Sequence, residues 1–279
     1  MPELPEVETV RRQLEKEFKG ALIKSVEVRF GQKVSPAAPT FIKKVTGKKI
    51  LFVERRAKLL IIHLSGGLNI LVHLKMTGRL LLRRAGDPLP KHTHVVFHLN
   101  KDRELRWEDW RRFGFLKLMD DAETAKHIEA QHYGPEPLLK SFTWQKMAMC
   151  LRSSPRKKIK PLLLEQTCIA GIGNIYAAES VWYAKLHPER RVSSISDAQM
   201  KQLHKGLVGI LKSSIPAGGS SADAYVDIYG HQGTFVPKLN VYGRDGKPCR
   251  RCGTALKNLV LGGRATVYCP KCQRLPTTP

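Results

Sequence analysis

Four cysteines near the end of the sequence have the spacing of a metal site. Cys249 and Cys252 form one Cys-x-x-Cys pair, and Cys269 and Cys272 form a second pair after sixteen intervening residues. Each two-residue spacer lets one turn supply two thiolates, and Zn²⁺ prefers four such ligands in a tetrahedron. We predict one structural zinc ion per chain, because four thiolates leave no open position for a substrate. The alternative, a pair of disulfides, is disfavoured in a reducing compartment.

A hairpin pattern separates the two cysteine pairs. Residues 259–261 and 265–268 are mostly apolar and flank Gly262-Gly263, which is typical of a β-turn, so Arg264 should lie at the tip. From residue 238 to the end, nine Lys or Arg residues accompany one acidic residue. A hairpin that is held by a metal ion and carries this charge is expected to contact DNA phosphates.

The first residues of the chain indicate a different chemistry. A proline in second place generally permits removal of the initiator Met1, which would leave Pro2 with a free secondary amine. An α-amino group has a pKa of about 7.7–8.0, so a useful fraction is neutral and nucleophilic near neutral pH. Such an amine can attack an anomeric carbon and form an iminium, with the neighbouring Glu3 available to move protons. The plainer interpretation is that Pro2 and Glu3 only precede a helix.

The overall charge favours a polyanionic partner. The 279 residues include 48 Lys and Arg against 24 Asp and Glu, a net charge of +24. Nucleic acid is the first candidate, an anionic membrane surface the second, and solubility alone the third interpretation. The sequence has no apolar run of about 18 residues and no secretory signal, so we expect a cytoplasmic protein without a membrane partner. Its thiols should stay reduced, and Cys150 and Cys168 should be separate, buried core residues.

The elements that must position these groups change in type along the chain. Residues 5–19 place apolar side chains on one helical face, and Pro5 suits the first helical turn. After residue 20 the pattern becomes a series of short strands with turn residues between them, which is typical of a β-sandwich or barrel. The clearest strands cover residues 22–30, 58–64, 68–74, 94–99 and 113–118, with turns at 65–67 and 100–102.

The second half of the sequence has helical patterns. Residues 134–137 indicate a linker, and Ser196 with Gln199 forms a capping box that opens a helix toward Ser213. Residues 217–237 are rich in glycine and lack periodicity, so we expect a mobile loop with a function. The prediction is a multidomain α+β protein with domains at residues 1–133, 134–237 and 238–279.

Ten short segments are distinctive in their order along the chain. They are residues 1–10, 55–58, 73–78, 91–95, 109–114, 134–138, 159–164, 171–176, 187–190 and 241–244. Together with the cysteine pattern, they resemble the bacterial formamidopyrimidine-DNA glycosylases, also called 8-oxoguanine DNA glycosylases. The resemblance implies an N-terminal β-sandwich that starts with a helix, a helical domain with a helix–two-turn–helix motif, and a C-terminal zinc finger.

By position, the resemblance implies a catalytic role for four residues. Pro2 corresponds to the nucleophile that forms a Schiff base with the sugar, and Glu3 to the acid that protonates the opening sugar. Lys58 corresponds to the proton donor of β-elimination, and Arg264 to the residue that assists δ-elimination. Lys and Arg side chains can stabilise a leaving phosphate in a desolvated cleft. Without the resemblance, Lys58 at a strand start would be interpreted as a solvated charge.

The resemblance also implies how the DNA is deformed. Met76, Arg111 and Phe113 match the residues that fill the gap left by an extruded base. Alternation alone would instead place Met76 and Phe113 in a core. The residues expected to contact phosphates are His92, Arg111, Arg156, Lys157, Lys158 and Asn174.

Two glycines precede the expected helix near Ile175. Gly171 and Gly173 allow close approach of the backbone, and amide groups at the helix start can point at an anion. A dinucleotide site is the alternative interpretation, but the third glycine and the preceding strand of that motif are missing.

We predict a bifunctional DNA glycosylase and abasic-site lyase that removes oxidised purines from double-stranded DNA and acts as a monomer. One alternative is the related branch that removes oxidised pyrimidines, against which Leu4 and residues 111–113 argue. The other alternative is a non-catalytic DNA-binding protein, which a retained Met1 would favour. Lesion preference is left open by departures from the expected pattern at Lys75, Arg79, Trp110 and Asp223.

Overall fold

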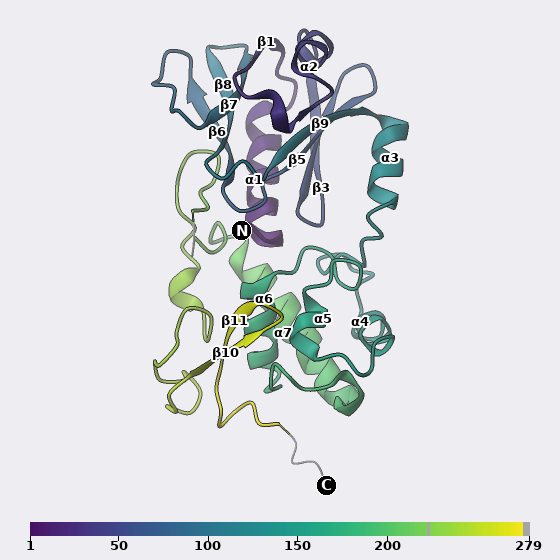
Figure 1. The fold of residues 1–279 in the computed structure, drawn as a ribbon, viewed down its shortest axis with the longest axis vertical. Helices are drawn as coiled ribbons and strands as arrows, with labels where there is room; N and C mark the ends of the chain where they lie inside the picture. Colours follow the sequence, from purple (N-terminus) through teal and green to yellow (C-terminus); the bar gives the residue numbers. More distant parts are fainter. Residues whose placement is uncertain (222–223, 276–279) are drawn as a thin grey trace. The chain divides into compact units, whose positions relative to one another are not determined.

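A computed structural model gives the fold of residues 1–221 and 224–275 (Figure 1). The chain divides into two compact units, residues 1–131 with 215–234 and residues 132–214 with 235–279. The sequence-based division placed residues 215–234 with the helical half. The structure groups them with the first unit, because side chains of this segment are buried in its core. Asp223 lies outside the described residues.

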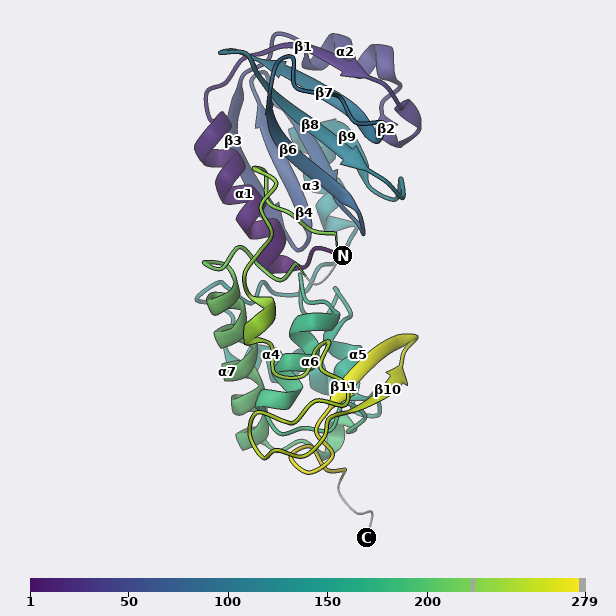
Figure 2. The same ribbon diagram turned by 90° about the vertical axis from the view of Figure 1, so that its left-hand side faces the viewer.

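Two facing sheets form the first unit (Figure 2). One has the strand order β1-β7-β8-β6 and the other β2-β9-β5-β4-β3, with antiparallel neighbours except for the parallel pair β2 and β9. The predicted β-sandwich is therefore confirmed. The strands are β1 (Ile23–Val28), β2 (Val34–Ser35), β3 (Ile50–Arg56), β4 (Leu59–Leu64), β5 (Leu68–His73), β6 (Gly78–Arg84), β7 (Thr93–Leu99), β8 (Arg103–Asp109) and β9 (Phe115–Asp120).

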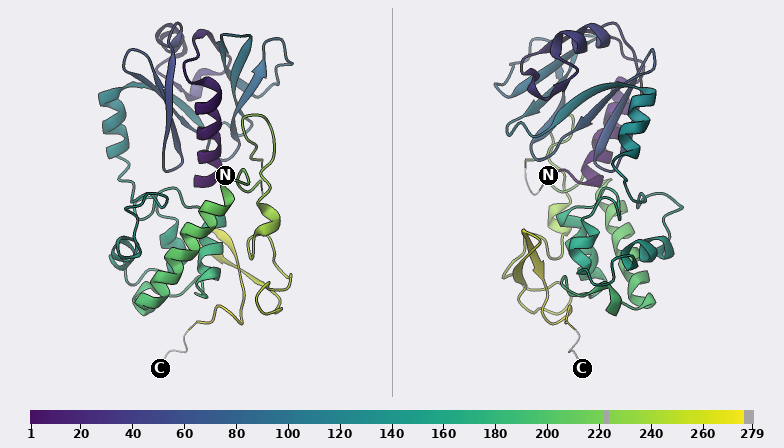
Figure 3. Two further views of the ribbon diagram at one scale, coloured as in Figure 1. Left: turned by 180° about the vertical axis from the view of Figure 1, so that it is seen from behind. Right: turned by 45° about the vertical axis from the view of Figure 1, so that its right-hand side comes forward.

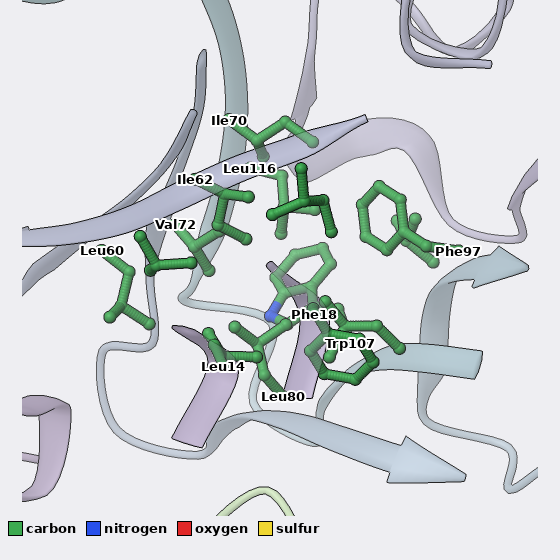
Figure 4. Close-up of a cluster of buried hydrophobic side chains, with 14 of the residues drawn as sticks. Leu14, Phe18, Leu60, Ile62, Ile70, Val72, Leu80, Phe97, Trp107 and Leu116 are labelled. Carbon is green, nitrogen blue, oxygen red and sulfur yellow. The ribbon is translucent and has the colours of Figure 1, made fainter. Parts of the chain in front are cut away.

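The main core of this unit is an apolar cluster to which both sheets and the first helix contribute (Figure 4). Helix α1 (Leu4–Phe18) supplies Leu14 and Phe18, each 1% exposed. Trp107 of β8 is completely buried in the same cluster. Because a buried side chain of this size contributes about 1.5–3 kcal/mol, the cluster fixes the register of α1 against the strands.

Smaller elements complete the first unit. Helix α2 (Ala38–Val45) follows β2, and α3 (Asp121–Glu129) follows β9. Residues Tyr225 and Ile228 of the predicted mobile loop join the core cluster, at 5% and 0% exposure. The carbonyl of Ile228 also accepts a hydrogen bond from the backbone N–H of Leu82 at 2.7 Å. The described parts of this segment are therefore packed, which periodicity alone did not indicate.

The second unit is helical with a C-terminal hairpin. Its longest helix, α7, is seen from behind in the left panel of Figure 3 as the long green helix. The predicted capping box is confirmed, since Ser196 Oγ accepts from the Gln199 backbone and Gln199 Oε1 accepts from the Ser196 backbone. The elements are α4 (Trp144–Arg152), α5 (Ile159–Leu163), α6 (Asn174–Tyr183), α7 (Asp197–Ser214), β10 (Lys257–Leu261) and β11 (Arg264–Tyr268). No helix within the described residues is long and apolar enough to cross a membrane.

The prediction for the two isolated cysteines is wrong. Cys150 and Cys168 are joined by a disulfide, with a Cα–Cα separation of 5.6 Å. Cys168 is buried, but Cys150 lies on a partly exposed face of α4. They are only 18 positions apart in sequence, and the chain between them turns back so that the two side chains meet.

Candidate active site and DNA-binding residues

The start of α1 holds two predicted catalytic residues in place. Pro2 is buried, and Glu3 is 3% exposed. The backbone N–H of Glu3 donates to Glu6 Oε2 at 2.8 Å, while Glu6 Oε1 accepts the backbone N–H of Ser220 at 2.7 Å. Gly219 has a φ of +82°, and a Cβ there would lie 2.6 Å from Glu6 Oε1, so this contact requires glycine. Glu6 thereby joins the helix start to the segment predicted as a loop.

Lys58 lies in the tight turn between β3 and β4. Arg56 pairs with Leu59 across this turn, so only Ala57 and Lys58 separate the strands. Ala57 has a φ of 54°, in the left-handed region that residues with side chains rarely adopt. Lys58 is 7% exposed, so its surroundings are not those of the solvated charge that the strand pattern alone suggests. In such dry surroundings a charge acts strongly on a reacting group.

His73 lies beside this turn, on the strand that pairs with β4. It is opposite Leu59 in the β4–β5 register. Burial, together with the charges of Lys75 and Lys58, lowers the pKa of His73 to about 3, so its ring is neutral at physiological pH. Its Nδ1 atom accepts the backbone N–H of Lys75 at 3.0 Å. The neutral ring thus supports the turn that carries Met76.

Asp109, at the end of β8, organises the two turns that carry the predicted wedge residues. It is completely buried. Its Oδ1 atom accepts the Thr77 hydroxyl and the backbone N–H of Arg111, and its Oδ2 atom accepts the backbone N–H of Gly114 at 2.7 Å. These three hydrogen bonds come from two separate segments of the chain, residue 77 and residues 111–114. The turn after β5 and the turn after β8 are therefore held together by one side chain.

The side chains predicted to form the wedge are exposed. Met76 is 40% and Phe113 49% exposed, and the Arg111 guanidinium lies 4.8 Å from the centre of the Phe113 ring. Exposed apolar side chains grouped in this way are typical of a contact surface. The alternative that Met76 and Phe113 belong to the core is wrong.

Trp110 forms a mixed aromatic and cationic patch beside the wedge turns. Its side chain is 48% exposed, and the Arg79 guanidinium lies 4.2 Å from its ring centre. The His92 ring meets it edge-on at 6.2 Å between ring centres. A flat ring with adjacent positive charge suits stacking on nucleic acid. Trp110, which departs from the pattern expected of the family, is therefore suited to contact DNA.

The basic run before α5 is exposed and partly paired. Lys157 Nζ lies 2.8 Å from Glu165 Oε1, and Lys158 Nζ lies 2.6 Å from Glu189 Oε1. Among residues 1–221 and 224–275, Arg156 has no such carboxylate partner. Exposed ion pairs contribute about 0–1 kcal/mol, so both lysines can exchange a carboxylate for a phosphate at little cost.

Asn174 begins α6 and ties this helix to the C-terminal hairpin. Its Oδ1 atom accepts Lys160 Nζ at 2.6 Å, and its Nδ2 atom donates to the carbonyl of Ala265 at 3.1 Å. Lys160 is 1% exposed and also donates to Thr266 Oγ1 at 2.7 Å. These contacts hold the Asn174 side chain in a fixed position at the start of α6. Arg264, the exposed first residue of β11, is presented by the strand that these contacts hold.

The four predicted zinc ligands meet at one point. The sulfur atoms of Cys249, Cys252, Cys269 and Cys272 all lie within 4.8 Å of one another. A tetrahedral zinc ion with Zn–S bonds of about 2.3 Å separates its sulfurs by about 3.8 Å, so the four thiols fit one ion. The backbone N–H groups of Arg251 and Cys272 point at the Cys249 and Cys269 sulfurs at 3.4 and 3.3 Å, as suits thiolates. Four thiolates close the coordination sphere, which makes the site structural.

Buried polar residues that hold these groups were not singled out from the sequence. Glu179, which is 1% exposed, accepts the backbone N–H groups of Val241 at 2.8 Å and Tyr242 at 3.0 Å, and so anchors the segment before the zinc site. The available signal was a polar residue within an apolar pattern. The residues missed are Glu6, His73, Asp109, Lys160 and Glu179.

A β-sandwich, a helical segment and a basic hairpin with four clustered cysteines fit the class of protein that the sequence resembles, a DNA glycosylase with a zinc finger. Family models match the chain segment by segment: the formamidopyrimidine-DNA glycosylase N-terminal domain at residues 1–116, the H2TH domain of these enzymes at 133–225, and the zinc finger found in FPG and IleRS at 246–275. The chain belongs to the formamidopyrimidine-DNA glycosylase family.

Individual relatives match over the whole chain. The formamidopyrimidine-DNA glycosylase of Desulforamulus reducens is 40% identical over 276 residues, 98% of this chain and 99% of that protein. That of Herpetosiphon aurantiacus is 42% identical over 275 residues, 98% of this chain and 100% of that protein. The Lactococcus lactis Fpg in complex with an abasic site containing DNA has a TM-score of 0.92 at 37% identity, covering 98% of this chain and 100% of that one. The predicted fold, zinc cofactor and enzyme class, a DNA glycosylase and lyase, are confirmed.

Proposed function

We propose that this protein removes oxidised purines, such as 8-oxoguanine and formamidopyrimidines, from duplex DNA and cleaves the resulting abasic site by β,δ-elimination. The observation that carries the proposal is that Glu3 and Lys58 are 3% and 7% exposed and are held by a hydrogen-bonded helix start and a two-residue turn. Similar solved structures support it, because they include Fpg with a Fapy-dG containing DNA and MutM with carbocyclic 8-oxo-G containing DNA.

Base removal begins at Pro2 once loss of Met1 exposes its amine. The neutral nitrogen attacks C1′ of the damaged nucleotide, the bond from C1′ to the base breaks, and the base leaves with the electron pair and takes up a proton. Glu3 donates a proton to the ring oxygen as the sugar opens, which leaves an iminium between Pro2 and C1′. An α-amino pKa of about 8 keeps enough of the amine neutral for this attack near pH 7.

Strand cleavage uses the iminium as an electron sink. The C2′ proton passes to solvent, and its electron pair converts the iminium to an enamine. The enamine then expels the 3′ phosphate, whose leaving oxygen takes up a proton from Lys58, the proton donor of this β-elimination. Arg264 assists the second elimination, which expels the 5′ phosphate, by stabilising the leaving oxyanion. Zinc, when bound, staples the segment that presents Arg264 and takes no part in the reaction.

DNA binding divides between a wedge and a set of phosphate contacts. Met76 and Phe113 fill the gap left by the extruded base, and Arg111 hydrogen-bonds within that gap. The enzyme acts as a monomer in the bacterial cytoplasm. The proposed phosphate contacts are His92, Arg111, Arg156, Lys157, Lys158 and Asn174.

Borohydride reduction during turnover tests the proposal. Duplexes that each carry one 8-oxoguanine, one formamidopyrimidine or one oxidised pyrimidine should show preferred excision of the purine lesions, with a trapped adduct that peptide mass analysis maps to Pro2. The matched control is the same protein with an uncleaved N-terminal tag, which should bind DNA without forming the adduct. Full strand cleavage by the tagged protein contradicts the nucleophile, whereas preference for oxidised pyrimidines contradicts the substrate.

A further inference from the structure

Glu8 and Arg55 connect the two elements that carry the proposed catalytic groups. The Arg55 Nε atom donates to Glu8 Oε2 at 3.1 Å, which joins β3 to α1. The Arg55 Nη1 atom donates to the backbone carbonyl of Ala57 at 2.8 Å. Because Ala57 directly precedes Lys58, a single side chain reaches from α1 to the turn that holds the lysine.

The helix makes this connection rigid. Glu8 lies on the same uninterrupted helix whose N-cap is Glu3, about 7.5 Å further along the axis at a rise of about 1.5 Å per residue. A contact at Glu8 therefore fixes the Lys58 turn relative to the helix start. The side chains of Arg55 and Glu8 are 8% and 11% exposed, so water competes little for their hydrogen bonds.

The turn itself contains a residue in an unfavourable backbone conformation. Ala57 adopts a φ of 54°, a conformation that glycine would adopt without cost and alanine does not. The hydrogen bond from Arg55 to the Ala57 carbonyl supplies a contact that holds this conformation. A change at Arg55 should therefore be felt first at Lys58, the next residue.

The Glu8 carboxylate is paired with three arginine side chains. Burial alone would raise the pKa of Glu8, but hydrogen bonds from Arg12 and Arg11 and the charge of Arg55 bring it below its usual value. Arg12 Nε lies 2.8 Å from Glu8 Oε1, and Arg11 Nη2 lies 3.1 Å from the same oxygen. Glu8 is therefore ionised at neutral pH, and its hydrogen bond to Arg55 is charge-assisted.

We propose that Glu8 and Arg55 are positioning residues that place Lys58 for the elimination step through the carbonyl of Ala57. The inference rests on the proposed role of Lys58. Neither side chain takes part in the reaction itself. Excision uses Pro2 and Glu3, whose helix start is held by Glu6, so loosening Arg55 should separate the two activities of the enzyme.

The experiment measures the two activities separately in single turnover. Base excision is read from an 8-oxoguanine duplex after hot alkali, and β-elimination from a duplex with a preformed abasic site. Arg55→Ala should slow elimination by about tenfold or more, as expected for loss of one charged hydrogen bond, and excision by less than about threefold. The borohydride adduct should still form. Arg55→Lys, which keeps the charge and one donor, should restore part of the elimination rate.

The carboxylate side of the pair has matched variants. Glu8→Ala should resemble Arg55→Ala, while Glu8→Gln keeps an oxygen acceptor for Arg55 and should lie between Glu8→Ala and the wild type. Arg12→Ala is the control, because Arg12 contacts the same carboxylate with a side chain that is 57% exposed and has no hydrogen bond to the Ala57 carbonyl. It should leave the ratio of elimination to excision unchanged. Thermal melting shows whether each variant is folded. If Arg55→Ala does not fold, Arg55→Lys and Glu8→Gln provide the test.

Lys58→Ala, measured in the same assays, distinguishes an error in the positioning role from an error in the proposed role of Lys58. If Lys58→Ala loses elimination while every Arg55 and Glu8 variant keeps the wild-type ratio, the positioning role is wrong and the proposed function stands. Equal losses of excision and elimination in Arg55→Ala would also overturn the positioning role, because a merely structural contact would lower both. If Lys58→Ala eliminates at the wild-type rate, the proposed role of Lys58 is wrong, and the inference fails with it.

Discussion

Two sets of charges with proposed roles, one in each unit, have opposite surroundings. In the first unit, Glu3 and Lys58 are 3% and 7% exposed. In the second unit, the side chains of Lys157 and Lys158 are 52% and 46% exposed, and each pairs with a surface carboxylate. Lys160 is the exception in the second unit, since it is 1% exposed and ties α6 to the hairpin.

This difference follows from what each charge has to do. A proton donor must meet one atom of the substrate within a fraction of an ångström, so its surroundings have to be rigid and dry before the substrate arrives. A phosphate contact acts through a longer-range field and tolerates both water and side-chain motion. Burial therefore distinguishes Glu3 and Lys58 from the proposed phosphate contacts, whereas Arg264, which is proposed to assist only the second elimination, is exposed.

The largest effect should come from the buried acid. Glu3→Gln keeps the size of the side chain but removes the proton that assists sugar opening, so excision of 8-oxoguanine should fall by about 10²–10⁴-fold. Affinity for undamaged duplex should change little, because no phosphate contact is lost. Single-turnover excision and duplex binding measure the two quantities. Glu27→Gln, at a carboxylate that is 50% exposed, is the control; excision by Glu3→Gln within threefold of it would contradict the assignment.

A smaller effect should follow loss of the metal. Cys249→Ser removes one of four zinc ligands, so zinc per chain should fall and the hairpin that presents Arg264 should lose its shape. Duplex affinity should weaken by roughly tenfold to hundredfold, the value of one or two charged hydrogen bonds of about 1.5 kcal/mol each. Elemental analysis and binding measurements check both, with Cys150→Ser as a variant that should retain zinc. Active wild-type protein without zinc would contradict this prediction.

Loss of a proposed wedge side chain should lower the rate of excision and leave the electrostatic part of DNA binding unchanged. Phe113→Ala removes an exposed ring that we propose stacks in the gap of the extruded base. Such stacking contributes about 1–3 kcal/mol, so excision should fall by about tenfold. The salt dependence of binding should not change. Leu51→Ala, at a similarly exposed apolar residue of β3, is the control. A changed salt slope with intact excision would show that Phe113 is misplaced as a wedge.

Features with local causes could be predicted from the sequence. The zinc ligands follow from two short spacers, α1 follows from apolar periodicity, and the start of α7 follows from a capping box. Each depends on residues within a few positions of one another, whose geometry is nearly fixed by the backbone. The hairpin around Gly262-Gly263 was predicted for the same reason, and Arg264 begins its second strand.

Features that depend on distant contacts could not be predicted. The carboxylate of Glu6 bonds to Ser220, 214 residues away, and Lys160 bonds to Thr266, 106 residues away. A polar residue within an apolar pattern is a local signal of burial, but it does not identify a partner so far away in the sequence. The core positions within residues 217–237 were missed for the same reason, and Cys150 with Cys168 was misjudged because pairing depends on how the intervening chain turns.

The smallest effects test the exposed charges of the second unit. Arg156 has no carboxylate partner in the described part of the chain, so its charge is available to phosphates at once, whereas Lys157 must first leave Glu165. Arg156→Ala should weaken binding to damaged and undamaged duplexes equally and reduce the salt slope by about 0.9, the value for one phosphate contact. Lys157→Ala should have a smaller effect for that reason.

The competing carboxylate gives the sharper test, because removing it should improve binding. Glu165→Gln frees Lys157 from an exposed ion pair whose contribution is about 0–1 kcal/mol, so duplex affinity should rise by up to about fivefold. Reduced repulsion between a carboxylate and DNA acts in the same direction, and Glu129→Gln on exposed α3 of the other unit controls for the change in net charge alone. Binding to one undamaged duplex is measured against salt for each variant. If Glu165→Gln binds no better than Glu129→Gln, the pair with Glu165 does not compete with phosphate, and Lys157 has to be removed from the proposed contacts.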